Sequence, residues 1–177
     1  MRMTAIAAVD QNWGIGKNGQ LLVSIPEDQR DVFRKHTLHS TVVYGRKTLD
    51  TFQGERLLPK RTNVILSRNS DFVKEGAMIV HSEDELRCFL DRLDDPDVAA
   101  QYAPAGKIFL IGGEDVYHRF LHLCTEAIIT KIQSAFSADA VFPNLDTLSE
   151  WDLEEESLPV LSVTGFTFSV CRYKRVK

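Results

Sequence analysis

Short apolar runs recur along the whole chain, and segments of helical pattern separate them. The runs TVVY, NVIL and KIFLI are continuously apolar, which is typical of strands buried on both faces of a parallel sheet. Near the C-terminus, FTFSVCRY alternates apolar and polar positions and predicts an antiparallel strand at the edge of the sheet. We expect strands at Thr4–Val9, Thr41–Tyr44, Asn63–Leu66, Ala77–Val80, Lys107–Ile111, Ala127–Ile132 and Phe166–Tyr173.

The segments between these runs carry apolar residues at helical spacing. Ser82 precedes Glu85 by three residues, which is the capping-box signal for the start of a helix. We interpret Asp91–Gly106 as a surface loop with a short helical turn, and Ser137–Ser149 as irregular. Strands that alternate with helices predict a mostly parallel α/β sheet with helices on both faces. The expected helices are about Glu27–His36, Lys47–Phe52, Glu83–Leu93 and Glu114–Leu123.

The composition excludes several classes of protein. With 177 residues, 44% of them hydrophobic and 26% charged, the chain suits a single folded domain, which we expect to span residues 1–177. A net charge of −4 does not suggest a nucleic-acid or membrane-surface partner. Three widely spaced cysteines without a C-x-x-C motif argue against a disulfide framework or a metal site and favour a reducing cytosol. No apolar run reaches the roughly 18 residues of a membrane helix, so we expect a cytoplasmic protein.

A glycine-rich segment, GIGKNG at residues 14–19, follows the first expected strand. It matches G-x-G-x-x-G, but in a Rossmann fingerprint the glycines open a helix directly. Here several residues and Pro26 separate them from the next helix, so the dinucleotide fingerprint is not favoured. A long loop that carries Trp13, Ile15 and Leu22 between glycines suits a lid closing over a flat ligand. A plain flexible loop is the alternative.

Two strand-to-helix junctions have the residues of an anion site. In YGRKT, Gly45 ends a strand and Arg46 and Lys47 open a helix, where free N–H groups and cations favour phosphate. In LIGGEDVY, Gly112 and Gly113 allow backbone to approach a ligand closely. Both junctions lie at the carboxyl ends of strands, where open α/β sheets bind ligands. A basic helix start and a tight turn are the purely structural alternatives.

A single carboxylate stands out at the start of the helix after Pro26. Asp28 lies four residues before Val32, so it leans toward the apolar side of that helix, while Glu27 aligns with polar positions. A carboxylate that faces an apolar cleft has a raised pKa and can hold or relay a proton. A simple complement to the helix dipole is the alternative role.

Together these residues resemble the dihydrofolate reductase family. The segments that match occur in the family's order and cover most of the chain: IAAVDQNWGIGKNGQLLVSIPED, TVVYGRKTLDTF, LLPKRTNVILSR, FLIGGEDVYHRFL, AIITKI and ADAVFP. The resemblance implies a single-domain α/β/α sandwich with a central, mostly parallel eight-stranded sheet. It also implies NADPH-dependent reduction of 7,8-dihydrofolate to 5,6,7,8-tetrahydrofolate, by hydride transfer to C6 and protonation at N5, in one-carbon metabolism.

The resemblance assigns substrate roles to individual residues. Asp28 and Thr130 match the catalytic pair, in which the acid hydrogen-bonds the pterin ring and assists protonation. Arg61 matches the arginine that binds the glutamate α-carboxylate of folate, a bidentate contact that suits a guanidinium. The full set of expected substrate-binding residues is Ile6, Ala8, Asp28, Val32, Phe33, Leu58, Arg61, Ile111 and Thr130.

The resemblance also implies an NADPH site. Arg46 and Arg68 are expected to bind the 2′-phosphate, and the bond between Gly112 and Gly113 is expected to be cis, which is rare outside proline. The glycine-rich segment matches the mobile loop that closes over nicotinamide. The expected cofactor-binding residues are Ala8, Ile15, Gly16, Gly45, Arg46, Lys47, Thr48, Ser67, Arg68, Ile111, Gly112, Gly113, Glu114, Asp115, Val116 and Tyr117.

Two departures from the family pattern leave questions open. Leu22-Val23 stands where the family usually has Pro-Trp, so an indole N–H that organises active-site water is missing. One extra residue lies between Pro26 and Thr37, so either Asp28 or Gln29 faces the pocket.

Three other functions remain as alternatives. The first is a related reductase acting on a pyrimidine of riboflavin synthesis, the second a phosphate-binding or nucleotide-hydrolysing module, and the third an inactive folate binder. For the favoured function we expect a monomer with a small-molecule substrate and no nucleic-acid or membrane partner.

Overall fold

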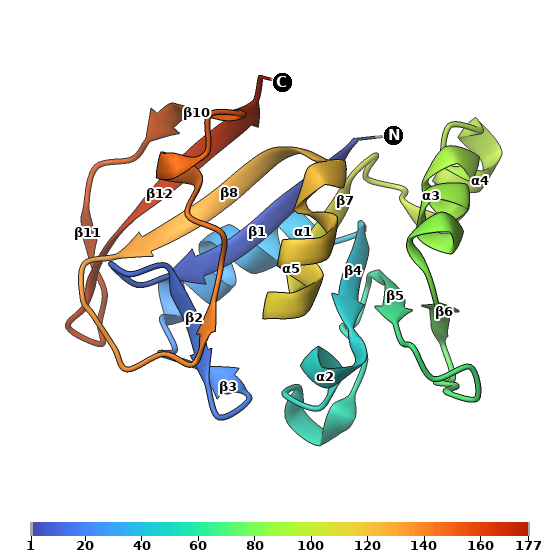
Figure 1. The fold of residues 1–177 in the computed structure, drawn as a ribbon, viewed down its shortest axis with the longest axis horizontal. Coiled ribbons are helices and arrows are strands. Elements are labelled where there is room, and N and C mark those ends of the chain that lie inside the picture. Colours follow the sequence, from blue (N-terminus) through green and yellow to red (C-terminus); the bar gives the residue numbers. More distant parts are fainter. Residues whose placement is uncertain (1, 177) are drawn as a thin grey trace.

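One mixed sheet runs through the centre of the molecule (Figure 1). The computed structural model describes residues 2–176. The strands of this sheet are β1 (Met3–Val9), β4 (Thr41–Gly45), β5 (Thr62–Leu66), β6 (Ala77–Val80), β7 (Ile108–Gly112), β8 (Cys124–Ile132), β10 (Trp151–Glu156), β11 (Val160–Leu161) and β12 (Thr167–Arg175). Eight of them follow the order β10-β12-β8-β1-β7-β4-β5-β6, and β11 pairs with β12. The pairs from β8 to β6 are parallel and those of β12 are antiparallel, which confirms the mostly parallel eight-stranded sheet.

The C-terminal strand differs in place from the prediction. Strand β12 is antiparallel as expected, but it lies between β8 and β10 rather than at the edge, so the edge assignment is wrong. The strand outside it, β10, is exposed at every position after Trp151. Its sequence, WDLEEE, is largely acidic and lacks the apolar pattern from which a strand is predicted.

The glycine-rich segment forms a hairpin instead of an irregular loop. Gly14 and Gly16 leave no room for a Cβ, which would lie 2.6 Å from the Ala138 Cβ and 2.8 Å from the Gln20 carbonyl oxygen, respectively. Gly19 has φ +74° in the hairpin turn. The glycines therefore serve strand packing and a turn, and they do not open a helix. The hairpin and one short strand make a second sheet, from here on the small sheet, of β3 (Gln20–Leu21), β2 (Gly14–Lys17) and β9 (Ala140–Val141).

The helices occur near their predicted positions, with two differences. The Ser82 hydroxyl caps its helix by accepting a hydrogen bond from the Glu85 N–H at 3.1 Å, as predicted. The segment interpreted as a loop contains a helix that Asp95 caps. In the first helix, seven residues are π-helical. The helical segments are η1 (Asp28–Arg34, π), α1 (Lys35–Thr37), α2 (Arg46–Leu49), η2 (Gln53–Glu55), α3 (Glu83–Arg92), α4 (Pro96–Tyr102), α5 (Glu114–Phe120), η3 (Leu121–Leu123) and η4 (Leu145–Thr147).

The central sheet is buried on both faces, because successive side chains of a strand point in opposite directions. Ala5 and Ile6 are neighbours in β1 but belong to different apolar clusters, and so do Val42 and Val43 in β4. The cluster of Ala5 includes residues of α3 and α5, and the cluster of Ile6 includes Val32 of η1. Helices therefore pack on both faces, as expected. Within residues 2–176, no helix has the length and apolar character needed to cross a membrane.

Candidate active site

A hydrogen bond between a partly buried carboxylate and a buried hydroxyl joins the first helix to the sheet. The Thr130 hydroxyl of β8 donates a hydrogen bond to the Asp28 Oδ1. Burial raises the pKa of the Asp28 carboxyl, and the hydrogen bond from Thr130 offsets part of this effect. Thr130 is itself buried, with 1% of its surface exposed. The pair can therefore hold a proton on Asp28 above the usual pH range of an aspartate.

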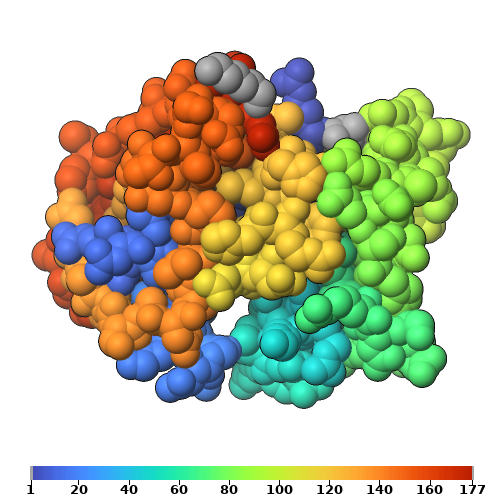
Figure 2. Space-filling model, in the orientation of Figure 1, coloured from blue at the N-terminus to red at the C-terminus, as the bar shows by residue number. Residues whose placement is uncertain are grey.

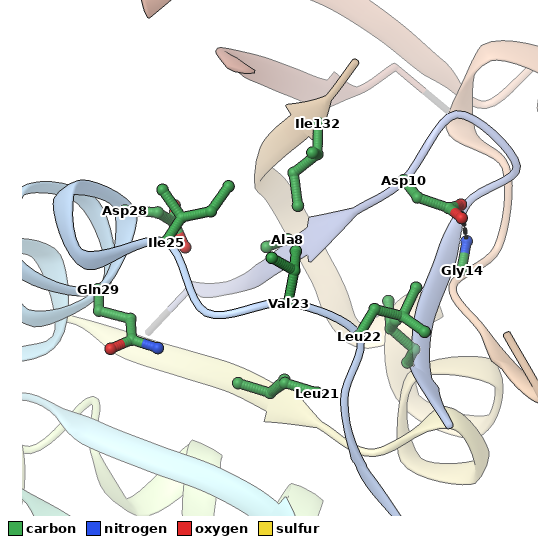
Figure 3. Close-up of a pocket in the computed structure, with 11 residues that line it drawn as sticks. Ala8, Asp10, Gly14, Leu21, Leu22, Val23, Ile25, Asp28, Gln29 and Ile132 are labelled. Carbon is green, nitrogen blue, oxygen red and sulfur yellow. Dashed lines mark hydrogen bonds between the residues drawn. The ribbon is translucent and has the colours of Figure 1, made fainter. Parts of the chain in front are cut away.

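Asp28 faces a pocket with mainly apolar walls (Figure 3). The walls come from β1, from the small sheet and the segment after it, and from the start of η1. Ala8 and Ile15, both predicted, line this pocket. Leu22-Val23 lines it as well, so this departure from the family pattern adds apolar wall. A carboxylate among apolar walls suits a flat heterocycle with N–H groups on one edge.

The π-helical segment takes up the extra residue of the first helix. A π-helix closes its hydrogen bonds at i→i+5 instead of i→i+4. Phe33, five residues after Asp28, therefore stands where the fourth residue would stand in an α-helix. The side chain that contacts Thr130 is that of Asp28, while the exposed Gln29 donates from Nε2 to the Ser24 Oγ at 3.0 Å. Both residues line the pocket, and Asp28 is the one that pairs with Thr130.

The predicted apolar substrate residues lie together on one face of the sheet. Beside the buried Ile6 and Val32 are three partly buried side chains, Phe33, Leu58 and Ile111. They come from β1, η1, the segment before β5 and β7, far apart in sequence. The structure therefore places these five residues in one apolar cluster.

Arg61 is held in place by its own neighbours. Its Nε donates to the Thr37 Oγ1 at 2.9 Å and its Nη1 donates to the Pro59 carbonyl at 2.8 Å. The guanidinium carbon lies 5.9 Å from the centre of the Phe33 ring. Burial and the nearby Arg34 lower the pKa of this guanidinium, which still stays charged. A fixed cation at the end of an apolar cluster suits a substrate carboxylate.

A cationic edge lies at the carboxyl ends of β4, β5 and β6. Arg46 and Lys47 begin α2 and are exposed, and Arg68 is exposed just after β5. The Arg46 guanidinium lies 5.8 Å from the centre of the Phe72 ring and 3.7 Å from the Asp50 carboxylate. These side chains come from adjacent parallel strands, so the structure brings the predicted phosphate residues to one edge.

His81 is a residue of this edge that the sequence interpretation missed. It directly follows β6, and its Nδ1 lies 2.8 Å from the carbonyl oxygen of Ser67, which follows β5. Its backbone N–H donates a hydrogen bond to the Glu85 carboxylate at 2.7 Å. The signal in the sequence was its position at the end of the third parallel strand of this edge.

The paired glycines lie beside the cationic edge. The peptide bond between Gly112 and Gly113 is cis. Gly112 has φ +131°, and a Cβ on Gly113 would come within 3.3 Å of the Thr48 Oγ1. Because neither glycine has a side chain, the backbone itself is exposed to a ligand at this edge, and backbone N–H groups suit the diphosphate of a dinucleotide. The buried hydroxyl of Tyr117 donates to the Ile6 carbonyl at 2.7 Å and ties α5 to β1, and its expected contact with the cofactor stays a prediction.

Trp13 is buried in the core and does not line the pocket of Asp28. It is 6% exposed, and its ring centre lies 6.1 Å from that of Phe142 and 6.3 Å from that of Tyr173. A large indole gains more from burial in the core than from solvent exposure on a loop. Of the apolar residues singled out on that segment, Ile15 and Leu22 line the pocket.

The fold and the site define an α/β protein in which a cationic edge of the sheet lies beside an apolar pocket with a partly buried acid. A family model described as dihydrofolate reductase matches residues 2–175, and the chain belongs to the dihydrofolate reductase family. Among relatives, it is 29% identical to dihydrofolate reductase of Neisseria gonorrhoeae, over 98% of each chain. It is 32% identical to that of Haemophilus influenzae, over 87% of this chain and 86% of the relative.

A solved structure supports the same conclusion. Dihydrofolate reductase from Enterococcus faecalis, complexed with NADP(H) and RAB-propyl, has a TM-score of 0.83 and 29% identity, covering 99% of this chain and 97% of its own. The family consists of NADPH-dependent oxidoreductases that reduce dihydrofolate, which confirms the fold, enzyme class and cofactor expected from the sequence. The pyrimidine reductase and the hydrolysing module lose their support.

Proposed function

We propose that Asp28 and Thr130 carry the reduction of 7,8-dihydrofolate to 5,6,7,8-tetrahydrofolate by this protein. The observation that supports this role is the buried Asp28 carboxyl, hydrogen-bonded to Thr130 inside a mainly apolar pocket. Bound NADPH supplies the hydride that adds to C6 of the pterin ring. The Asp28 carboxyl hydrogen-bonds the ring N–H groups and assists delivery of the proton that N5 gains.

The apolar cluster and Arg61 account for binding of the rest of the substrate. Phe33, Leu58 and Ile111 provide apolar surface for the ring system between pterin and tail. Arg61 binds the α-carboxylate of the glutamate tail with the guanidinium edge that its protein contacts leave available. Ile6 and Val32 support this wall from the core.

The cationic edge and the paired glycines fit NADPH. Arg46 and Arg68 bind its 2′-phosphate, with Lys47, Thr48 and Ser67 around them. The backbone of Gly112–Gly113 lies against its diphosphate, where any larger residue would meet Thr48. We also propose that the protein acts as a monomer in the cytoplasm and needs no nucleic-acid partner.

The test is a direct assay with matched variants. Protein mixed with NADPH and dihydrofolate should lower the nicotinamide absorbance, and NADH should replace NADPH poorly. Asp28→Asn should lose most of the neutral-pH rate, whereas Asp31→Asn is the control, because Asp31 is exposed and pairs with Arg30 at 2.7 Å. If wild-type protein binds NADPH and dihydrofolate but the nicotinamide absorbance does not fall, the protein is the inactive folate binder.

A further inference from the structure

The wall of the pocket formed by the small sheet is not part of the central sheet. Gly14, Ile15 and Leu21 line the pocket from β2 and β3. In the described residues, β2 pairs with β3 and with β9 but with no strand of the central sheet. Two attachments hold this wall: Asp10, just after β1, whose Oδ1 accepts a hydrogen bond from the Gly14 N–H at 2.8 Å, and strand β9, which pairs with β2.

A carboxylate of α5 holds β9. The Glu114 Oε1 accepts a hydrogen bond from the Val141 N–H at 2.9 Å. The next residue, Phe142, packs its ring 4.5 Å from the centre of the Tyr117 ring, also on α5. Figure 2 shows this segment, in orange, lying against the yellow surface of α5. Strand β9 is thus attached to α5 on one side and to β2 on the other.

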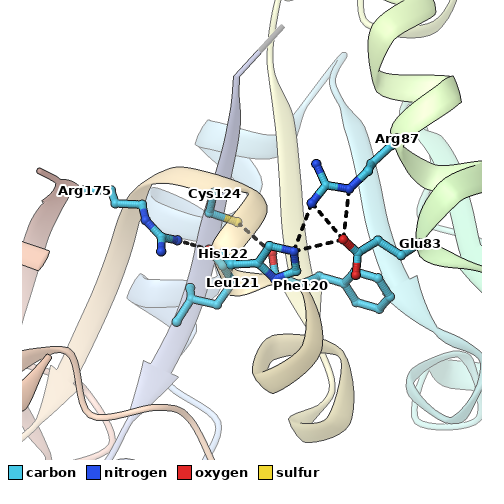
Figure 4. Close-up of polar contacts among 7 residues, drawn as sticks. All are labelled: Glu83, Arg87, Phe120, Leu121, His122, Cys124 and Arg175. Atoms are coloured by element: carbon cyan, nitrogen blue, oxygen red, sulfur yellow. Dashed lines mark hydrogen bonds and ion pairs between the residues drawn. The ribbon is translucent and has the colours of Figure 1, made fainter. Parts of the chain in front are cut away.

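The far end of α5 is anchored to the body of the protein (Figure 4). The Nε2 of His122, in η3, lies 3.0 Å from the Glu83 Oε1 of α3. The Arg175 Nη1 of β12 donates to the Leu121 carbonyl at 3.3 Å. Because α5 is fixed at this end, Glu114 at its other end offers a stable attachment point for the small sheet.

We infer that Glu114 is a positioning residue that couples the paired-glycine turn to the pocket wall. Glu114 directly follows Gly113, which the proposed function places against the cofactor, so the inference depends on that proposal. A continuous path leads from Gly113 through the Glu114 carboxylate and the Val141 N–H to Gly14, the register partner of Val141. A hydrogen bond to a charged acceptor is stronger than a neutral one, which suits it to carry this coupling. The role differs from direct cofactor contact by Glu114, which the sequence led us to expect.

Two variants and one control separate this role from general stability. Glu114→Ala removes the acceptor, and Glu114→Gln keeps an acceptor oxygen without the charge. Glu126→Ala is the control, because Glu126 is an exposed carboxylate on β8. The measurements are hydrogen–deuterium exchange of residues 14–21 and 140–141, with and without NADPH, and the dissociation rate of NADPH.

In the cofactor-free protein, Glu114→Ala should speed exchange of these amides by about two- to tenfold, the effect of one lost hydrogen bond. NADPH should protect the same amides in wild-type protein and less so in Glu114→Ala, from which it should also dissociate about two- to tenfold faster. Glu114→Gln should lie between wild type and alanine, and Glu126→Ala should match wild type.

If these amides exchange in Glu114→Ala at the wild-type rate, the attachment of β9 by Glu114 is refuted. Faster exchange with unchanged NADPH protection and dissociation would overturn the coupling and leave Glu114 a structural contact. If Glu114→Ala does not fold, the same readings on Glu114→Gln decide. A wild-type protein without turnover would refute the proposed function, whereas exchange in the cofactor-free protein would still report the attachment.

Discussion

Replacing Asp28 by asparagine should make the protein more stable at neutral pH and slower as an enzyme. Burial raises the pKa of Asp28. A raised pKa means that the stability from protonation is fully present below the ordinary aspartate pKa of 3.8 and is lost as the pH rises through the folded-state pKa. At neutral pH the ionised carboxylate therefore lowers the free energy of unfolding. Asparagine carries no charge and keeps an Oδ1 that accepts the hydrogen bond from Thr130.

The size of the gain follows from the surroundings of Asp28. Its carboxylate is partly buried, and its hydrogen bond from Thr130 offsets only part of the desolvation. We expect a gain of about 1 kcal/mol at pH 7, within the roughly 0.5–2 kcal/mol typical of a single stabilising substitution. For a chain of this length, that corresponds to a rise of about 2–4 °C in Tm. The neutral-pH rate should fall by about 10²–10⁴-fold, the usual contribution of a general acid.

Urea unfolding of Asp28→Asn, Asp31→Asn and wild type, at neutral pH and near pH 4, measures the effect. The gain of Asp28→Asn should shrink toward the lower pH, because wild-type Asp28 is then increasingly protonated. Its turnover should partly recover at low pH, where dihydrofolate is already protonated. An Asp28→Asn protein that is less stable than wild type at neutral pH would refute the reasoning, and so would an equal gain in Asp31→Asn.

Three further predictions concern the substrate tail, the cofactor and the helix register. Arg61→Leu should raise the KM for dihydrofolate by about 1.5–3 kcal/mol in free-energy terms, the loss of one hydrogen bond to a charged group. The control is Arg56→Leu, at an exposed arginine of the same segment, which should leave the KM unchanged. An unaltered KM in Arg61→Leu contradicts the tail assignment. Arg46→Ala should weaken the binding of NADPH by about 1.5–3 kcal/mol and leave the KM for NADH unchanged. An equal loss of affinity for both cofactors would exclude the contact between Arg46 and the 2′-phosphate. Deleting Asp31 should convert the π-helical segment to an α-helix with Asp28 and Phe33 still on one side. A crystal structure of the variant would show the conversion, and turnover should stay within about fivefold of wild type. A hundredfold loss of turnover would mean that the π-helix itself is required.

Seven strands of the central sheet and the glycines of the two strand-to-helix junctions could be predicted from sequence because their signals are local. TVVY, NVIL and KIFLI are apolar runs, each followed directly by glycine or serine, and each one is a strand in the structure. The same holds for the cap at Ser82, which needs only Glu85 three residues later. The acid at position 28 was also visible, since its spacing to Val32 lies within one helix.

The remaining features depend on residues that are distant in the chain. Thr130 contacts Asp28 across 102 positions because β8 lies next to β1, and no local pattern contains that pairing. The π-helical form of residues 28–34 also had no signal in the local sequence, because π-helices are rare and occur mostly as insertions within α-helices. Trp13 is buried because Phe142 and Tyr173 offer it a packing site from other elements.

The amino-acid sequence by itself thus determined most strands of the central sheet and the main helices, because apolar periodicity and capping act over a few residues. It also indicated the side chains that we propose to carry the chemistry. The tertiary structure alone decided the edge of the sheet, the partners of each functional side chain and the attachment of the small sheet to α5. These depend on strand order and packing, in which the free energy comes from contacts between segments rather than within them.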